Sequence, residues 1–259
     1  MRNGEKETMN AALLVAHGTS NPAGREEFVH LAELFQRQEP KRIVEYGFLE
    51  KTQPDILSAI GRCAEQGAQN IAAIPCFLGA GKHAALDIPG ELNKSRTLYP
   101  GLEFRCGEPI PLHPKIIELC RLRIEEAERK AGEEARSETL LLVLGGGSLR
   151  KEGNADVFAL TRILMESMDF GGAETGFLAS VSPSMAQILE HAPRLGLRRI
   201  LVFPYLLFHG VLFNRARTII RCFAEKTGTK TILSEPLNAH PLLCEALRQI
   251  HREILSIPD

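Results

Sequence analysis

"LLVAHGTSNPAG", residues 13–24, is an apolar run that ends on His17 and then turns toward a helical pattern. Asn21 is a favourable N-cap, and Pro22 suits the first position of a helix. The stretch therefore predicts a strand, a short loop and a helix, with an imidazole at the carboxyl end of the strand.

The sequence contains an internal repeat that spans nearly the whole chain. "LLVLGGGSLRKEG", residues 141–153, repeats the opening stretch with Gly145 in place of the histidine. Three further pairs follow in the same order: "VEYGFLEKTQP" (44–54) with "AETGFLASVSP" (173–183), "NIAAIPCFLGAG" (70–81) with "RILVFPYLLFHG" (199–210), and "GEPIPLHPKIIEL" (107–119) with "SEPLNAHPLLCEA" (234–246). We therefore expect two similar domains, residues 1–134 and 135–259.

Each half alternates short apolar runs with longer amphipathic stretches, which is the pattern of βα units in a parallel sheet. Strands are predicted near 11–16, 43–48, 70–75, 102–105, 140–144, 173–178, 199–204 and 231–234. Helices are predicted near 22–38, 54–66, 83–97 and 113–130, with counterparts in the second half. The sequence predicts an α/β protein of two lobes, each with a parallel four-stranded sheet flanked by helices. An active cleft between the lobes would be lined by the carboxyl ends of the strands.

Composition excludes several classes of function. A net charge of -1 gives no general attraction for nucleic acid or for an anionic membrane. The six cysteines include no C-x-x-C pair, so local zinc-ribbon and iron–sulfur patterns are absent. No run approaches the roughly 18 apolar residues of a membrane span, and the polar start lacks a signal-peptide core. We expect a cytoplasmic protein without nucleic-acid or membrane partners.

Three polar residues are predicted to meet at one edge of the first sheet. His17 ends the first strand, Glu50 follows the second, and His83 follows a glycine-rich turn after the third. Each could be explained as an ordinary loop residue. Together, two imidazoles and a carboxylate are suitable ligands for cobalt(II), iron(II), nickel(II) or zinc(II), and three ligands leave coordination positions open.

The repeat indicates that this set occurs once. At the matching positions of the second half, the sequence has Gly145, Ala179 and Leu212, none of which offers a ligand side chain. We interpret the first half as the lobe that carries the metal site and the second as a lobe without it. His209 is interpreted as a structural or cleft-lining residue, and the sequence leaves open a secondary metal site there.

Anion binding is expected in the second half. The "GGGSLRKEG" turn lacks a phosphate-loop spacing, but the amides of Gly145 and Gly146 could receive a substrate carboxylate. Arg215 and Arg217 are predicted to open a helix at the edge of the cleft, where they could bind the same groups.

With these motifs in view, the chain resembles the class II tetrapyrrole chelatases, the sirohydrochlorin cobaltochelatase and ferrochelatase family, in its long two-lobe form. The resemblance covers essentially the full length and rests on "LLVAHGTSNP", "YGFLEKTQPDI", "IPCFLGAGKHAALDIP", "GFLASVSPS" and "FPYLLFHGVLF". It implies a chelatase-like fold and metal-handling roles for His17, Glu50 and His83.

The resemblance also implies an activity: insertion of a divalent metal into sirohydrochlorin or a related precorrin, in cobalamin or siroheme biosynthesis. Cobalt(II) is expected first and iron(II) next, and nickel(II) is a further candidate. An ordinary imidazole, with a pKa of about 6.5, is suited to accept a pyrrole proton near neutral pH. Lys82 would join Arg215 and Arg217 in binding the carboxylates of the substrate. No cofactor is expected beyond the substrate metal, and neither a nucleotide nor an iron–sulfur cluster.

Two alternatives stay open on the residues alone. A metal-dependent hydrolase could use the same His, Glu and His, although the chain has no H-E-x-x-H motif. A metal or tetrapyrrole carrier would bind without turnover.

Overall fold

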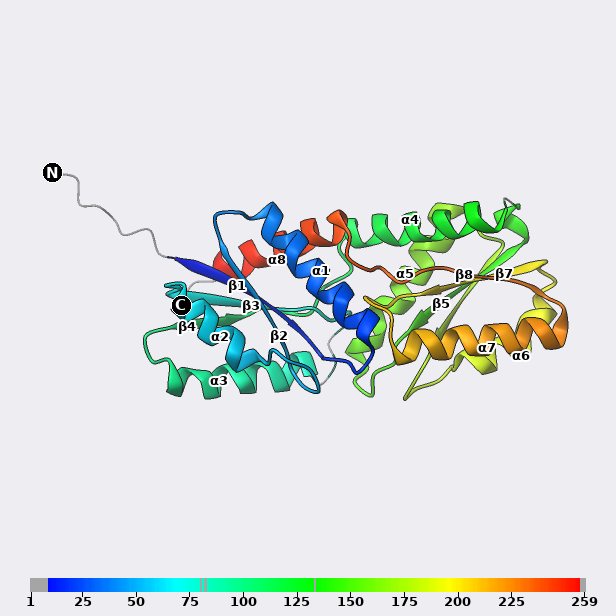
Figure 1. The fold of residues 1–259 in the computed structure, drawn as a ribbon. Coiled ribbons are helices and arrows are strands. Elements are labelled where there is room, and N and C mark those ends of the chain that lie inside the picture. Colours follow the sequence, from blue (N-terminus) through cyan, green and yellow to red (C-terminus); the bar gives the residue numbers. More distant parts are fainter. Residues whose placement is uncertain (1–8, 80, 82, 133, 257–259) are drawn as a thin grey trace.

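The two halves of the chain form two lobes that lie end to end in an elongated molecule (Figure 1). The computed structural model describes residues 9–79, 81, 83–132 and 134–256, without the side chains of His83 and Ala84. The strands are β1 (Asn10–Ala16), β2 (Ile43–Phe48), β3 (Asn70–Pro75), β4 (Glu103–Cys106), β5 (Thr139–Gly145), β6 (Gly172–Phe177), β7 (Arg199–Pro204) and β8 (Lys230–Leu233). The helices are α1 (Pro22–Gln38), α2 (Ile56–Glu65), α3 (Ile88–Leu98), α4 (Pro114–Ala131), α5 (Glu152–Met168), α6 (Met185–His191), α7 (Val211–Thr227) and α8 (Pro241–Ser256).

The two sheets have the same topology. Their strand orders are β2-β1-β3-β4 and β6-β5-β7-β8, and every pairing is parallel. The prediction of two similar α/β lobes with parallel four-stranded sheets is confirmed. None of the helices in the described part of the chain is long and apolar enough to cross a membrane.

The helices begin where the capping residues predict. Asn21 Oδ1 accepts a backbone N–H of α1 at 3.0 Å. The Nδ1 atoms of His113 and His240 accept backbone N–H groups of α4 and α8 in the same way. The helix predicted over 83–97 differs, because His83–Asp87 forms a π-helical turn before α3 begins.

The strand register corrects one detail of the repeat. Ala16 pairs with the last residue of β2, and Gly145 pairs with the last residue of β6. Gly145 is therefore the counterpart of Ala16, and the counterpart of His17 is Gly146. The sequence match was wrong by one position because a run of three glycines can be aligned in two ways. The conclusion is unchanged, since neither glycine offers a ligand.

The last helix of each half packs against the other lobe. α4 lies on the second sheet, where Glu128 forms an ion pair of 3.3 Å with Arg199, whose side chain is 1% exposed. α8 lies on the first sheet and α1, where Arg248 Nε is 2.6 Å from Glu39 Oε1. Each lobe is thus completed by a helix from the other half of the sequence, and the lobes do not coincide with residues 1–134 and 135–259.

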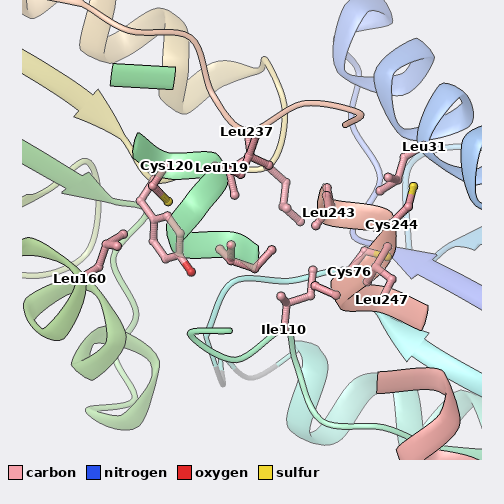
Figure 2. Close-up of a cluster of buried hydrophobic side chains, with 14 of the residues drawn as sticks. Leu31, Cys76, Ile110, Leu119, Cys120, Leu160, Leu237, Leu243, Cys244 and Leu247 are labelled. Atoms are coloured by element: carbon pink, nitrogen blue, oxygen red, sulfur yellow. The ribbon is translucent and has the colours of Figure 1, made fainter. Parts of the chain in front are cut away.

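This exchange produces one hydrophobic core that spans both lobes. Figure 2 shows its centre, where side chains of α1, α4, α5 and α8 converge with those of the connecting loops. The labelled members are Leu31, Cys76, Ile110, Leu119, Cys120, Leu160, Leu237, Leu243, Cys244 and Leu247. The cysteines among them are free thiols, and burial raises the pKa of Cys244 to about 12.

The packing of α8 predicts a loss of stability in acid. His251 is 1% exposed against Phe35, and burial together with the charge of Arg42 lowers its pKa to about 4. An unfolded imidazole has a pKa of about 6.5. As the pH falls from about 6.5 to 4, His251 binds a proton in the unfolded chain but stays neutral in the folded chain. This group should therefore reduce the free energy of unfolding by up to about 3 kcal/mol over that range.

Substitution His251→Leu should remove this share of the pH dependence. The measurement is urea unfolding of both proteins between about pH 8 and pH 4. At pH 8 the imidazole is neutral in both states, so any difference there reports packing alone. If the free energy of unfolding fell equally with pH in the two proteins, the prediction would be contradicted.

Candidate functional site

A cleft lies between the lobes at the carboxyl ends of the strands. Its cavity has a volume of about 520 Å³ and is lined by the loops that follow β1, β3, β5 and β7. The wall is mainly apolar, formed by Phe28, Phe48, Phe77, Leu78, Leu206, Leu207, Phe208, Val211, Leu212 and Phe213. Such a surface suits a flat, largely apolar ligand better than a small polar one.

Two of the predicted ligands meet at this cleft. His17 follows β1 directly, and its Nδ1 lies 3.3 Å from Glu50 Oε1. The two side chains are 39% and 41% exposed, and Glu50 is not among the residues that line the cavity. His17 itself lines the cavity. An imidazole and a carboxylate held this close can share one divalent ion or one proton.

The backbone around Gly18 sets the distance between these side chains. Glu50 N donates to His17 O at 3.0 Å, which continues the pairing of β1 with β2 beyond the strands. Gly18 has a φ of 96°, and a Cβ atom there would lie 1.8 Å from Glu50 O. Only glycine fits this position, because the conformation and the contact both exclude a side chain. Thr19 and Thr52 join the same two loops through hydrogen bonds of 3.0 Å.

For His83, the third predicted ligand, the structure describes the backbone but not the side chain. The backbone of His83 begins the π-helical turn before α3, after the cleft-lining residues Phe77 and Leu78. Its side chain and the whole of Lys82 lie outside the described residues. The roles of His83 as a metal ligand and of Lys82 as a substrate contact stay predictions.

His209 has partners other than a metal. Among the described residues, no group of three His, Cys, Asp or Glu side chains could hold a metal ion. The Nδ1 of His209 is 2.5 Å from Glu27 Oε1, and its Nε2 is 2.9 Å from Glu235 Oε2. The structure thus gives the ring two carboxylate partners at the rim of the cleft.

The predicted substrate contacts of the second lobe separate into two groups. Gly146 lines the cleft, and Gly145 and Gly146 both line an adjoining cavity of about 320 Å³. Arg215 and Arg217 lie on the exposed face of α7. The Cζ atom of Arg217 lies over the ring of Phe213, 5.7 Å from its centroid. Arg217 borders a different cavity, of about 460 Å³. Neither arginine is among the residues that line the cleft cavity.

Sequence reasoning missed Lys51, a cationic residue that lines the cleft. Lys51 borders both the cleft and a neighbouring groove of about 720 Å³ that also contains Arg25. Its φ of 63° is unusual for a residue other than glycine, and it turns the chain directly after Glu50. Among the described residues Lys51 has no ion-pair partner. The only available signal was its position beside Glu50.

The fold and the site together define a class: a two-lobe α/β protein with a histidine–carboxylate pair at the edge of an apolar interlobe cleft. The CbiX family model matches residues 11–127 and 140–254, one match for each half of the repeat. The chain belongs to the CbiX family.

Similar proteins of known activity cover most of the chain. A sirohydrochlorin ferrochelatase of Priestia megaterium is 30% identical over 97% of this chain and 93% of its own length. A sirohydrochlorin cobaltochelatase of the same organism is 29% identical over 93% of this chain and 78% of its own.

Solved structures share the fold. SirB from Bacillus subtilis with Fe3+ superposes with a TM-score of 0.84 at 24% identity, covering 96% of both chains. The sirohydrochlorin chelatase SirB from Bacillus subtilis subspecies spizizenii, in complex with cobalt, has a TM-score of 0.79 at 23% identity and covers 95% of both chains.

The repeat supplies a matched pair of variants that test the loop at the site. Gly18→Ala should place a Cβ against Glu50 O and disturb the distance from His17 to Glu50. Gly147→Ala makes the same clash in the second lobe, where φ is 91° and the Cβ would lie 1.9 Å from Ala179 O. Each variant should lose at least about 1–2 kcal/mol of stability.

Only Gly18→Ala should also weaken the binding of cobalt(II). Urea unfolding measures the first effect, and titration calorimetry with cobalt(II) measures the second. If Gly147→Ala weakened metal binding as much as Gly18→Ala does, the assignment of the metal to the first lobe would be wrong.

Proposed function

We propose that this chain inserts a divalent metal ion into sirohydrochlorin without ATP, acting in cobalamin or siroheme biosynthesis. The single observation that carries the proposal is the pair of His17 and Glu50, 3.3 Å apart at the edge of an apolar cleft. The activities of the relatives in the same family support the choice of substrate.

The chemistry of insertion matches what these residues can do. The ring of sirohydrochlorin loses two pyrrole N–H protons as four nitrogens bind the ion, and the ion sheds its previous ligands. His17 and Glu50 can hold the ion while the remaining coordination positions stay open to the nitrogens of the ring. The same groups can take up the protons that leave the ring.

The cleft can hold the substrate in the orientation that this reaction needs. The aromatic and leucine side chains of the wall can cover the face of the macrocycle, which is flat and apolar. The carboxylates on its rim would remain near solvent, where Lys51 borders the cavity. Gly146, the counterpart of His17, offers no side chain that could compete for the ion.

Cobalt(II) is the proposed metal, with iron(II) second. A donor set of imidazole and carboxylate accepts several divalent ions, and their order of affinity is similar in most proteins. The relatives that cover most of the chain include both a cobaltochelatase and a ferrochelatase, so insertion rates measured with each ion decide between the two metals.

The metal ligand and the proton acceptor for insertion should come from the first lobe. Purified protein should convert sirohydrochlorin to its cobalt complex in an anaerobic absorbance assay without nucleotide. His17→Ala should lower the rate at least about 100-fold, because the variant loses both a ligand and a proton acceptor. Leu212→Ala, at the opposite wall of the cleft, should keep most of the turnover and lose up to about 2 kcal/mol of stability.

Circular dichroism shows whether each variant remains folded. A wild-type rate no greater than the uncatalysed rate with every divalent ion would refute the proposed function. Tight binding of sirohydrochlorin without turnover would instead identify a carrier. Equal losses of turnover in His17→Ala and Leu212→Ala, with normal substrate binding, would contradict a single metal site.

Lys51 should contribute to the binding of the anionic substrate. Lys51→Met should raise KM about two- to fivefold at low salt, because an exposed charge pair contributes little more than this. The effect should shrink at high salt through screening. Lys41→Met, which removes an exposed lysine before β2, is the control. A salt-independent KM, equal to that of wild type, would place the carboxylates elsewhere.

A further inference from the structure

The lobes touch at two places beside the cleft, and the internal repeat relates these places to each other. At the first, Gly24 of α1 lies against the loop after β7, where a Cβ would be 2.2 Å from His209 O. At the second, Gly79 of the loop after β3 lies against α5, where its Cβ would be 2.6 Å from Gly153 O. Gly24 and Gly153 hold equivalent positions in their helices. In both places one lobe's first helix meets the other lobe's strand-end loop.

The first crossing carries a charged clip. Glu27, on α1, accepts the backbone N–H of His209 at 2.8 Å with Oε2 and contacts the ring Nδ1 at 2.5 Å with Oε1. Glu235 contacts the other ring nitrogen at 2.9 Å. The ring also packs edge-on against Phe213, at 4.4 Å between centroids. One carboxylate from the first lobe therefore holds both the backbone and the side chain of a second-lobe residue.

The second crossing lacks this clip. The counterpart of Glu27 is Asp156, and the counterpart of His209 is Ala80, which lies outside the described residues. Asp156 forms no ion pair among the described residues, and burial raises the pKa of its carboxyl. Within the described part of the chain, the clip, like the pair of His17 and Glu50, is found in one of two equivalent places.

The clip lies where it can set the width of the cleft. His209 lines the same cavity as His17, and the loop that it anchors supplies much of the apolar wall. Phe28, next to Glu27 on α1, packs edge-on against Phe208 of this loop, with 5.9 Å between the ring centroids. A change in the clip would move the wall of the second lobe relative to the metal-binding edge of the first.

We propose that Glu27 and His209 are positioning residues for metal insertion. They hold the wall of the second lobe at a fixed distance from His17, so that the cleft keeps the width at which it binds the macrocycle. This inference rests on the proposed function for its kinetic part and on the clip alone for its structural part. Neither residue needs to touch the reacting atoms.

The kinetic test uses Glu27→Gln, which keeps the size of the side chain and removes its charge. KM for sirohydrochlorin should rise about tenfold, whereas kcat should change by less than about twofold. His209→Gln should have a similar effect, and the double variant should be no worse than either single one, because both act through one contact. Glu26→Gln, on the exposed face of α1, is the matched control and should leave KM unchanged. A fall in kcat at constant KM, or additive effects in the double variant, would overturn the proposal.

The structural test needs no substrate. Spin labels on Cys222, which is exposed on α7, and on a Thr97→Cys variant of α3 report the distance between the lobes. Glu27→Gln should broaden the distribution of this distance, and Glu26→Gln should not. An unchanged distribution in Glu27→Gln would overturn the clip whether or not the protein inserts metal. A broadened distribution in a protein without insertion activity would uphold the clip and refute only the proposed function.

Discussion

The hydrogen bond from Glu50 N to His17 O is the contact on which the site depends. It continues the parallel pairing of β1 and β2 past the ends of both strands, and it brings two side chains to one edge. Gly18 allows the turn that follows, because no side chain fits between the loops. The second lobe keeps the same bond, from Ala179 N to Gly146 O at 3.1 Å, and places no ligand on it. A repeated backbone thus supports chemistry in one copy only.

The exchange of α4 and α8 decides how the two walls of the cleft are held. Because each lobe includes a helix from the other half of the chain, their separation would expose a core that both lobes share. Two polar contacts join the halves of the chain. Glu128 pairs with the buried Arg199 behind the second sheet, and Glu27 contacts His209 at the cleft. Large movements of the lobes are therefore opposed by the core, which leaves small adjustments to contacts at the cleft.

The sequence by itself determined the elements and much of the site. Strands, helices and capping residues follow local periodicity, and the internal repeat identifies two similar sheets. The neighbouring positions of His17 and Glu50 could be predicted, because the carboxyl ends of adjacent parallel strands meet at the same edge. The absence of this ligand set from the second half could also be predicted, since the positions that match His17, Glu50 and His83 carry glycine, alanine and leucine.

Tertiary structure decided the features that depend on contacts between distant parts of the chain. The counterpart of His17 is Gly146, a choice made by backbone pairing that a run of glycines leaves ambiguous. The exchanged helices could not be predicted, since an amphipathic pattern shows which face of a helix is buried but not which sheet buries it. Arg217 turns to stack on Phe213, whereas Lys51 lines the cleft. The contact of Glu27 with His209 joins residues far apart in sequence, and only the packing of one lobe against the other brings them together.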